Sequence, residues 1–108
     1  MWKDDSDKIE ELCKDIKKIK SLPEVCPMCK KIGVHIYMHV YNRKTRRGGV
    51  WGWCSECHTF FHGSTFVPDY WENCTDVEVE KLCAIPAYLE ELKEIIDEHV
   101  NAIIKKRM

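Results

Sequence analysis

Hydrophobic residues recur at helical spacing near the start of the chain. Between residues 6 and 20 they fall mostly three or four positions apart, which places them on one stripe of a helix. The stripe consists of Ile9, Leu12, Cys13, Ile16 and Ile19. Ser6 or Asp5 suits the N-cap position, and Pro23 disfavours helix at the residue before it. The pattern predicts a helix over residues 6–21.

The middle of the chain changes to the period of a β-strand. Between Gly33 and Asn42 apolar and polar or aromatic residues alternate strictly. One face carries Val34, Ile36, Met38 and Val40, and the other carries His35, Tyr37, His39 and Tyr41. The second face is either packed under a helix or presented to a partner. A polar, glycine-ended turn at 43–49, a strand at 50–54 and a third strand at 58–67 then predict three antiparallel strands.

The last third of the chain returns to helical patterning. Thr75 and Glu78 have the spacing of a capping box, which predicts a short helix ending near Ile85. Pro86 suits the first turn of a longer helix. The apolar stripe of this longer helix is Leu89, Leu92, Ile95, Ile96, His99, Val100, Ile103 and Ile104. The helical segment therefore covers 75–108, and the predicted fold class is α+β: a three-stranded antiparallel sheet flanked by an N-terminal helix and two C-terminal helices.

Length and composition place these elements in a single domain, residues 1–108. The chain is 44% hydrophobic and 32% charged, which is typical of a soluble globular protein. The net charge of −1 produces no global field toward nucleic acid or membrane. The first twenty residues alternate acids and lysines and contain no apolar leader, and no stretch is long enough to span a bilayer. We therefore expect a cytoplasmic protein with no membrane partner, whose thiols stay reduced.

The seven cysteines of the chain are the most informative composition feature, because an odd number cannot all pair as disulfides. Four of them form two C-x₂-C units, Cys26/Cys29 and Cys54/Cys57. Two tight turns of this kind can aim four thiolates at one tetrahedral zinc ion. The arrangement resembles the zinc ribbon over residues 24–70, although Lys30 and His58 stand where many ribbons have glycine. The resemblance implies one structural Zn²⁺ on a metal-stapled sheet, with no ligand position open for catalysis.

Other interpretations of the C-x₂-C units stay open at this point. The same ligand set can hold iron, and the four thiols can also be buried, paired as disulfides or used as a redox pair. Cys54 to His58 also matches a haem-attachment sequence. A second metal site could be formed by His58, His62, Cys74 and Cys83. We expect Cys13 and Cys83 to be buried packing residues, and His99 to be a partly buried histidine.

The chain contains no glycine-rich phosphate loop and no Gly-x-Ser-x-Gly motif, so a non-catalytic function is predicted. Charge is unevenly distributed, with four basic residues against one acid in 33–68 and five against ten in 69–108. The basic residues interleave with aromatics in the hairpin 41–53, a combination that suits single-stranded nucleic acid. The candidate nucleic-acid contacts are Tyr41, Arg43, Lys44, Arg46, Arg47, Trp51 and Trp53.

The acidic last third favours a second hypothesis, binding of another protein. A long amphipathic helix with an acidic face, preceded by large aromatics, is typical of a docking surface. The candidate partner-binding residues are Tyr70, Trp71, Glu90, Glu91 and Glu94. In size and charge the chain is similar in outline to bacterial immunity and antitoxin proteins, and an adaptor function is equally compatible. Protein binding is the favoured hypothesis, with nucleic-acid binding as the alternative.

Overall fold

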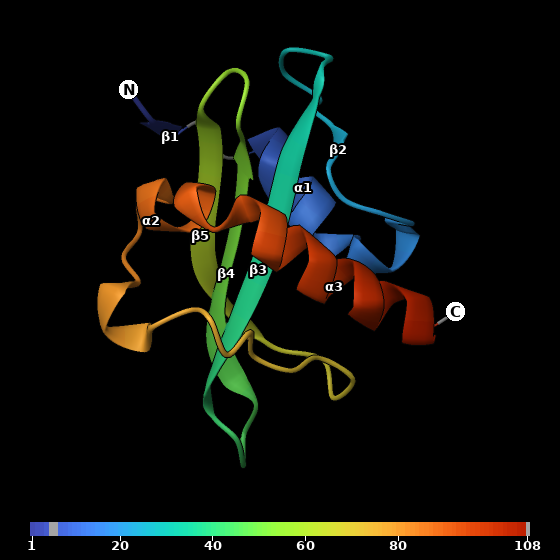
Figure 1. The fold of residues 1–108 in the computed structure, drawn as a ribbon, viewed down its shortest axis with the longest axis vertical. Helices are drawn as coiled ribbons and strands as arrows, with labels where there is room; N and C mark the ends of the chain where they lie inside the picture. The colour runs from blue at the N-terminus through green and yellow to red at the C-terminus, as the bar shows by residue number, and fades with distance from the viewer. Residues whose placement is uncertain (5–6, 108) are drawn as a thin grey trace.

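The computed structural model describes residues 1–4 and 7–107, and its centre is a five-stranded mixed β-sheet (Figure 1). The strands lie in the order β1-β5-β4-β3-β2. Their bounds are β1 Lys3–Asp4, β2 Glu24–Val25, β3 Ile32–Asn42, β4 Arg47–Cys54 and β5 Thr59–Phe66. The helices are α1 Asp7–Lys14, α2 Ala87–Glu91 and α3 Lys93–Arg107, with 3₁₀ turns η1 Ile16–Lys18 and η2 Val79–Lys81. The α+β class is confirmed.

The predicted sheet of three antiparallel strands is incomplete. Strands β3, β4 and β5 form an antiparallel meander, but β2 adds to β3, and β1 runs parallel to β5. Each added strand has two residues, which is too short to produce a recognisable alternation. Strand β1 is held by tertiary contacts instead, because the Lys3 amide donates to the His58 carbonyl at 2.8 Å and the Trp2 ring stacks on the His58 ring.

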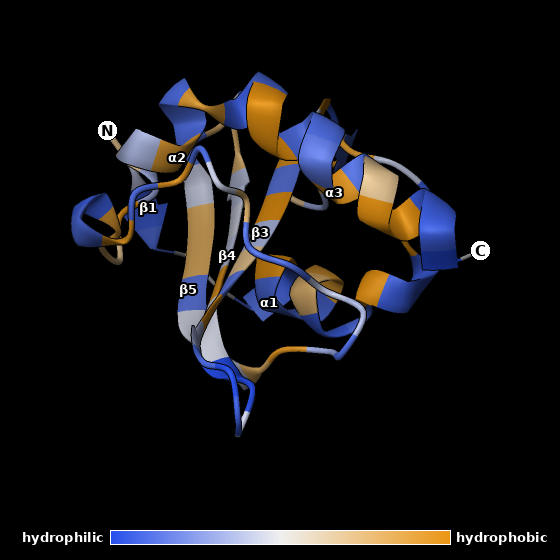
Figure 2. Ribbon diagram, turned by 60° about the horizontal axis from the view of Figure 1, so that its bottom comes forward, coloured by the Kyte–Doolittle hydropathy of each residue, from blue (hydrophilic) through white to orange (hydrophobic). Residues whose placement is uncertain are grey.

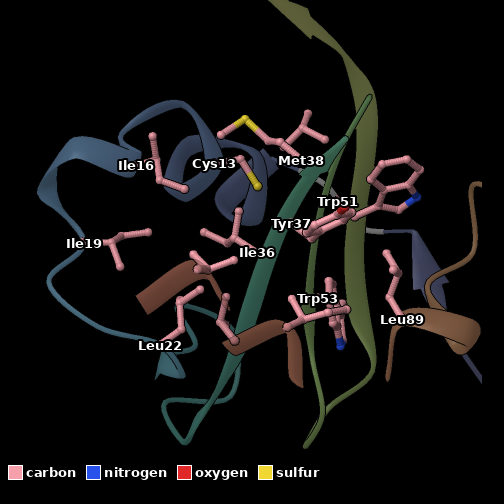
Figure 3. Packing of buried hydrophobic residues seen from close by; sticks show 14 of the residues in the cluster. Cys13, Ile16, Ile19, Leu22, Ile36, Tyr37, Met38, Trp51, Trp53 and Leu89 are labelled. Carbon is pink, nitrogen blue, oxygen red and sulfur yellow. The ribbon is translucent and has the colours of Figure 1, made fainter. Parts of the chain in front are cut away.

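Helix α1 covers one face of the sheet. The face bearing Ile36 and Met38 lies on the same side as Cys13 of α1, as the close view of the core shows (Figure 3). Gly52 of β4 permits this close packing, because a Cβ there would lie 2.6 Å from the Cys13 sulfur and 2.8 Å from a methyl carbon of Ile9. The sheet face predicted to be apolar is thus a buried helix–sheet interface.

The C-terminal segment covers the opposite face. Tyr37, Trp51, Trp53 and Trp71 are all at most 1% exposed, and Leu89 of α2 packs into the same layer (Figure 3). Helix α3 crosses β3 on this side (Figure 1). The histidine–tyrosine face of β3 is therefore core up to His39, and only Tyr41, which is 56% exposed, reaches solvent.

The N-terminal helix is shorter than the predicted 6–21. Helix α1 ends at Lys14, and η1 then follows. The stripe still packs as predicted, since Ile9, Cys13, Ile16 and Ile19 are all buried. The proposed N-cap residues, Asp5 and Ser6, lie outside the described residues.

The two predicted C-terminal helices also need correction. The helix predicted from Thr75 to Ile85 is reduced to the 3₁₀ turn η2, whose N-cap has no side-chain hydrogen bond. Tertiary hydrogen bonds replace the capping box: the Glu78 amide donates to the Tyr88 hydroxyl, and the Trp51 indole donates to the Cys83 carbonyl. The longer helix is interrupted at Leu92, which separates α2 from α3.

Figure 2 shows the distribution of polarity over this fold. The β3–β4 hairpin is hydrophilic and projects from the body, and hydrophilic and hydrophobic residues alternate along α3. In the part of the chain that the structure describes, no helix has the length and apolar character needed to cross a membrane.

Candidate metal centre

The four cysteines of the C-x₂-C units meet at one end of the sheet. Cys26 and Cys29 lie in the turn between β2 and β3, and Cys54 and Cys57 lie in the turn between β4 and β5. Val34 is paired with Cys54 across β3 and β4, so the sheet register brings both turns to the same end. These turns are at the top of Figure 1, opposite the hairpin tip.

The sulfur positions match a tetrahedral metal site. The Cys26 and Cys57 sulfurs are 3.7 Å apart, the Cys29 and Cys54 sulfurs are 3.7 Å apart, and all four lie within 4.8 Å of one another. Sulfurs about 2.3 Å from a central zinc ion lie about 3.8 Å apart in an ideal tetrahedron. A disulfide would instead bring two sulfurs to about 2.05 Å, and all seven cysteines are free thiols. The cluster can therefore hold one metal ion.

The two turns have the same local geometry, which supports a shared role as metal-binding knuckles. In each, the amide two residues after the first cysteine donates to its sulfur: Met28 to Cys26 at 3.3 Å, and Glu56 to Cys54 at 3.4 Å. In each, the residue after the second cysteine has a left-handed backbone, with φ 68° at Lys30 and 62° at His58. Lys30 and His58 thus adopt the conformation for which glycine is usually chosen.

The thiols differ in acidity in the absence of a metal. Burial raises the pKa of Cys26, and it raises the pKa of Cys54 to about 12. Burial also opposes ionisation of Cys57, but hydrogen bonds from the Thr59 hydroxyl and amide outweigh it and lower the Cys57 pKa to about 7. Of the three thiols whose pKa is shifted, Cys57 is therefore the one that ionises most readily.

The remaining cysteines and histidines do not join this centre. Among residues 1–4 and 7–107, no other set of three potential ligands converges. His58 stacks on Trp2, and His62 lies against Trp51 with ring centroids 4.8 Å apart. The remaining thiols divide by exposure: Cys13 and Cys74 are buried, and Cys83 is exposed. The prediction that Cys83 is buried is wrong, because the segment around it forms no helix to pack its side chain.

A hydrogen-bonded network joins the second knuckle to the C-terminal helices. Glu90 of α2 accepts from the Ser55 hydroxyl at 2.6 Å and from the Trp53 indole at 3.0 Å. The Lys93 ammonium lies 3.0 Å from the other Glu90 oxygen. His35 lies 2.9 Å from the Ser55 oxygen and 2.8 Å from the Asp97 carboxylate. No sequence motif indicates this network, because its members come from four separate segments.

Ser55, His35 and Asp97 follow the order of a serine–histidine–aspartate triad, but the protons are distributed differently. A hydroxyl has one proton, and Glu90, at 2.6 Å, is its acceptor. The Ser55 proton is thus directed at Glu90, while Nε2 of His35 lies 2.9 Å from the Ser55 oxygen and Nδ1 lies 2.8 Å from the Asp97 carboxylate. The network joins the knuckle to α2 through Glu90 and to α3 through Asp97.

The candidate nucleic-acid residues separate into two groups. Trp51 and Trp53 are 1% and 0% exposed, so their rings belong to the core. Arg46 donates to the carbonyls of Pro68 and Trp71, both at 2.6 Å, and so holds the loop that follows β5. The exposed members are Tyr41, Arg43, Lys44 and Arg47. Phe66, which is 65% exposed and lies under the Arg47 guanidinium, joins this group at the hairpin end of the sheet.

The candidate partner-binding residues are also divided. Trp71 is fully buried and donates its indole N–H to the Met38 carbonyl at 2.8 Å. Tyr70 is half-buried and accepts from Arg107 at 3.1 Å. Glu90 belongs to the network described above, whereas Glu91 and Glu94 are exposed.

A hollow of about 560 Å³ lies between α3 and the segment 72–76. Its acidic lining residues are Glu72, Asp76 and Glu98, and its bulky apolar lining residue is Ile95. Ile95 is 43% exposed although it belongs to the predicted apolar stripe, so the stripe is wider than the buried interface.

Comparison with known protein families, with curated proteins and with solved structures finds no match to this chain. The resemblance to zinc ribbons therefore rests on the local geometry of the two knuckles. That geometry supports a four-cysteine metal site and leaves the class of the whole fold to be described on its own terms.

Proposed function

We propose that the chain is a zinc-stapled, non-catalytic protein-binding module whose acidic C-terminal face docks a basic segment of another protein. The observation that carries the proposal is the position of Ile95. This bulky apolar side chain is 43% exposed and lines a hollow together with Glu72, Asp76 and Glu98.

The chemistry of this surface supports a cationic partner. Glu98 lies on the same side of α3 as Ile95, three residues after it, and Glu91 and Glu94 are further exposed acids of α2 and α3. No lysine or arginine lines the hollow among the described residues. An apolar anchor surrounded by like charge gives a partner both a desolvated contact and electrostatic steering. A partner segment with lysines or arginines around one apolar residue fits this surface, as in an immunity or adaptor interaction.

The four-cysteine ligand set favours a structural role for zinc over a catalytic role. All four ligand positions are cysteines, so a tetrahedral ion would be fully coordinated and would have no position for a substrate or water. Iron is compatible with the same donors, and elemental analysis distinguishes the two metals.

Charge reversal on the acidic face tests the proposal. We expect a variant with Glu91→Lys, Glu94→Lys and Glu98→Lys to lose at least about tenfold in affinity for a partner captured from the native cell, and Ile95→Ala to lose about 1 kcal/mol or more. Affinity is measured by isothermal titration, and folding of each variant is checked by circular dichroism.

A matched variant controls for net charge. Glu11→Lys, Asp15→Lys and Glu80→Lys make the same charge change at exposed positions outside α2 and α3. Equal loss of affinity in both triple variants, or no loss in the α3 variant, would contradict docking at this face.

Nucleic-acid binding at the hairpin is the second candidate, supported by the exposed cluster of Tyr41, Phe66, Arg43, Lys44 and Arg47. With three cationic groups the expected salt dependence is shallow, with a slope of about −2 in log affinity against log salt. Single-stranded oligonucleotide binding is measured by fluorescence anisotropy at low and high salt. Absence of binding at ~50 mM salt would retire this candidate, and binding lost in Phe66→Ala would favour it over protein docking.

A further inference from the structure

The two outer strands of the meander, β3 and β5, differ in how many hydrogen-bonding groups on their outer edges are already paired. On β3, the Asn73 side chain accepts from the Val40 amide at 2.7 Å and donates to the Val40 carbonyl at 3.0 Å. The Trp71 indole donates to the Met38 carbonyl, and β2 pairs with the beginning of the strand. Side chains and a short strand thus occupy hydrogen-bonding positions along the β3 edge. Proteins commonly protect edge strands in this way against unwanted strand pairing.

In the described part of the chain, the outer edge of β5 is less protected than that of β3. Among residues 1–4 and 7–107, only β1 pairs with it, opposite Thr59 and Phe60. Two backbone hydrogen bonds show which residues of β5 point their N–H and C=O groups outward. The Lys3 amide donates to the His58 carbonyl on the side of β1, which is the outer side. The Val67 amide donates to the Arg46 carbonyl on the side of β4, which is the inner side. Because successive residues of a strand point their backbone groups to opposite edges, even-numbered residues of β5 face outward. These are His62, Ser64 and Phe66, and all three are exposed.

The side chains of β5 do not discourage pairing either. The strand Thr59–Phe66 contains no aspartate, glutamate, lysine, arginine or proline, the residues that usually protect an edge. Burial lowers the pKa of His62, with Asp4 partly opposing, which disfavours the charged form of this side chain. Two copies of the strand can therefore approach without like charges facing each other.

We propose that β5 pairs antiparallel with β5 of a second copy of this chain, with Ser64 opposite Ser64 on the two-fold axis. In this register His62 of each copy lies opposite Phe66 of the other, and all three outward residues form hydrogen-bonded pairs. A register centred one residue earlier would place Phe66 opposite Phe60, whose outer side is already paired with β1.

The length of the free edge matches this arrangement. At one end it is bounded by β1, and at the other the chain turns after Val67, where the Trp71 amide donates to the Pro68 carbonyl. The pairing also covers Phe66, which is 65% exposed in the single chain. The second copy lies at the sheet edge, so the acidic face on α3 remains accessible in each copy.

Sedimentation of the metal-loaded protein tests this proposal. We expect a monomer–dimer equilibrium over about a hundredfold range of concentration. Ser64→Pro should weaken dimerisation at least about tenfold, because it removes the central donor of each copy, and proline is tolerated at an outward-facing edge position. Ser64→Ala keeps the amide and should dimerise like the unmodified chain.

Hydrogen exchange and a charged variant also test the pairing of β5 with β5. Hydrogen exchange at the His62, Ser64 and Phe66 amides should slow as the dimer forms. If Ser64→Pro disturbs folding, Ser64→Lys places two charges opposite each other and should weaken the dimer, most strongly at low salt. A monomer at every concentration, or a dimer indifferent to Ser64→Pro and Ser64→Lys, would overturn the pairing. A monomer whose β5 amides are protected only by a different protein would assign the edge to a heterologous strand.

Discussion

Removing the metal should destabilise the protein by several kcal/mol, because metal binding to four preorganised cysteines is coupled to folding. The four knuckle sulfurs lie within 4.8 Å of one another, so the fold places all four ligands around one point. We expect Cys54→Ser to have a comparable effect, because Cys54 is fully buried at the end of β4. Thermal unfolding of chelator-treated protein and of the variant measures both effects.

Cys83→Ser is the matched control for the metal prediction. Cys83 is exposed and lies outside the cluster, so its substitution should change stability by less than about 0.5 kcal/mol. Elemental analysis should find one metal per chain in the unmodified protein and in Cys83→Ser, and none tightly bound in Cys54→Ser. Unchanged thermal stability after complete metal removal would contradict a structural role for the metal.

Glu90→Ala should be the most destabilising substitution of a single acidic residue. The fully buried Trp53 indole and the Ser55 hydroxyl both lose their acceptor, at about 1–3 kcal/mol for each unsatisfied group. Glu91→Ala, at the exposed neighbouring position, should cost less than about 0.5 kcal/mol. Chemical denaturation of the two variants measures the difference, and equal stabilities would show that the network contributes nothing.

The same carboxylate predicts a dependence of stability on pH. Burial raises the pKa of Glu90, but hydrogen bonds from Ser55, Lys93 and Trp53 outweigh it and hold the pKa below its ordinary value of 4.5. A lowered pKa in the folded state stabilises the protein above the unfolded-state pKa, and this stabilisation is lost as the pH falls through the folded-state pKa. Acid should therefore destabilise the unmodified protein below about pH 4.5 more than it destabilises Glu90→Ala.

The metal knuckles could be predicted because their geometry is local. Two residues between cysteines determine a tight turn whatever surrounds it, and the alternation in residues 33–42 predicts the strand that connects the knuckles. Lys30 and His58 depart from the glycine expected there, yet both adopt the left-handed backbone, and their amides donate to the carbonyls of Cys26 and Cys54 at 2.9 Å.

Several aromatic and charged residues that the sequence pattern predicts to contact a partner are buried or bonded within the fold. Trp51, Trp53 and Trp71 resemble a binding surface in the sequence, but each packs in the core and satisfies its indole N–H within the fold. Glu90 and Arg46 were candidates for external contacts, and both have internal partners instead. Such contacts join residues 20 or more positions apart, which periodicity over one element cannot detect.

The sequence by itself determined the four-cysteine cluster, the antiparallel meander and the helical character of both ends, because these depend on spacing within short segments. Tertiary structure decided which faces are covered, how the last third is divided between loop and helix, and which sheet edge is protected. The physical reason is that burial, hydrogen-bond partners and unpaired edges depend on segments that are distant along the chain. The acidic face around Ile95 and the free edge of β5 therefore became visible only in the folded molecule.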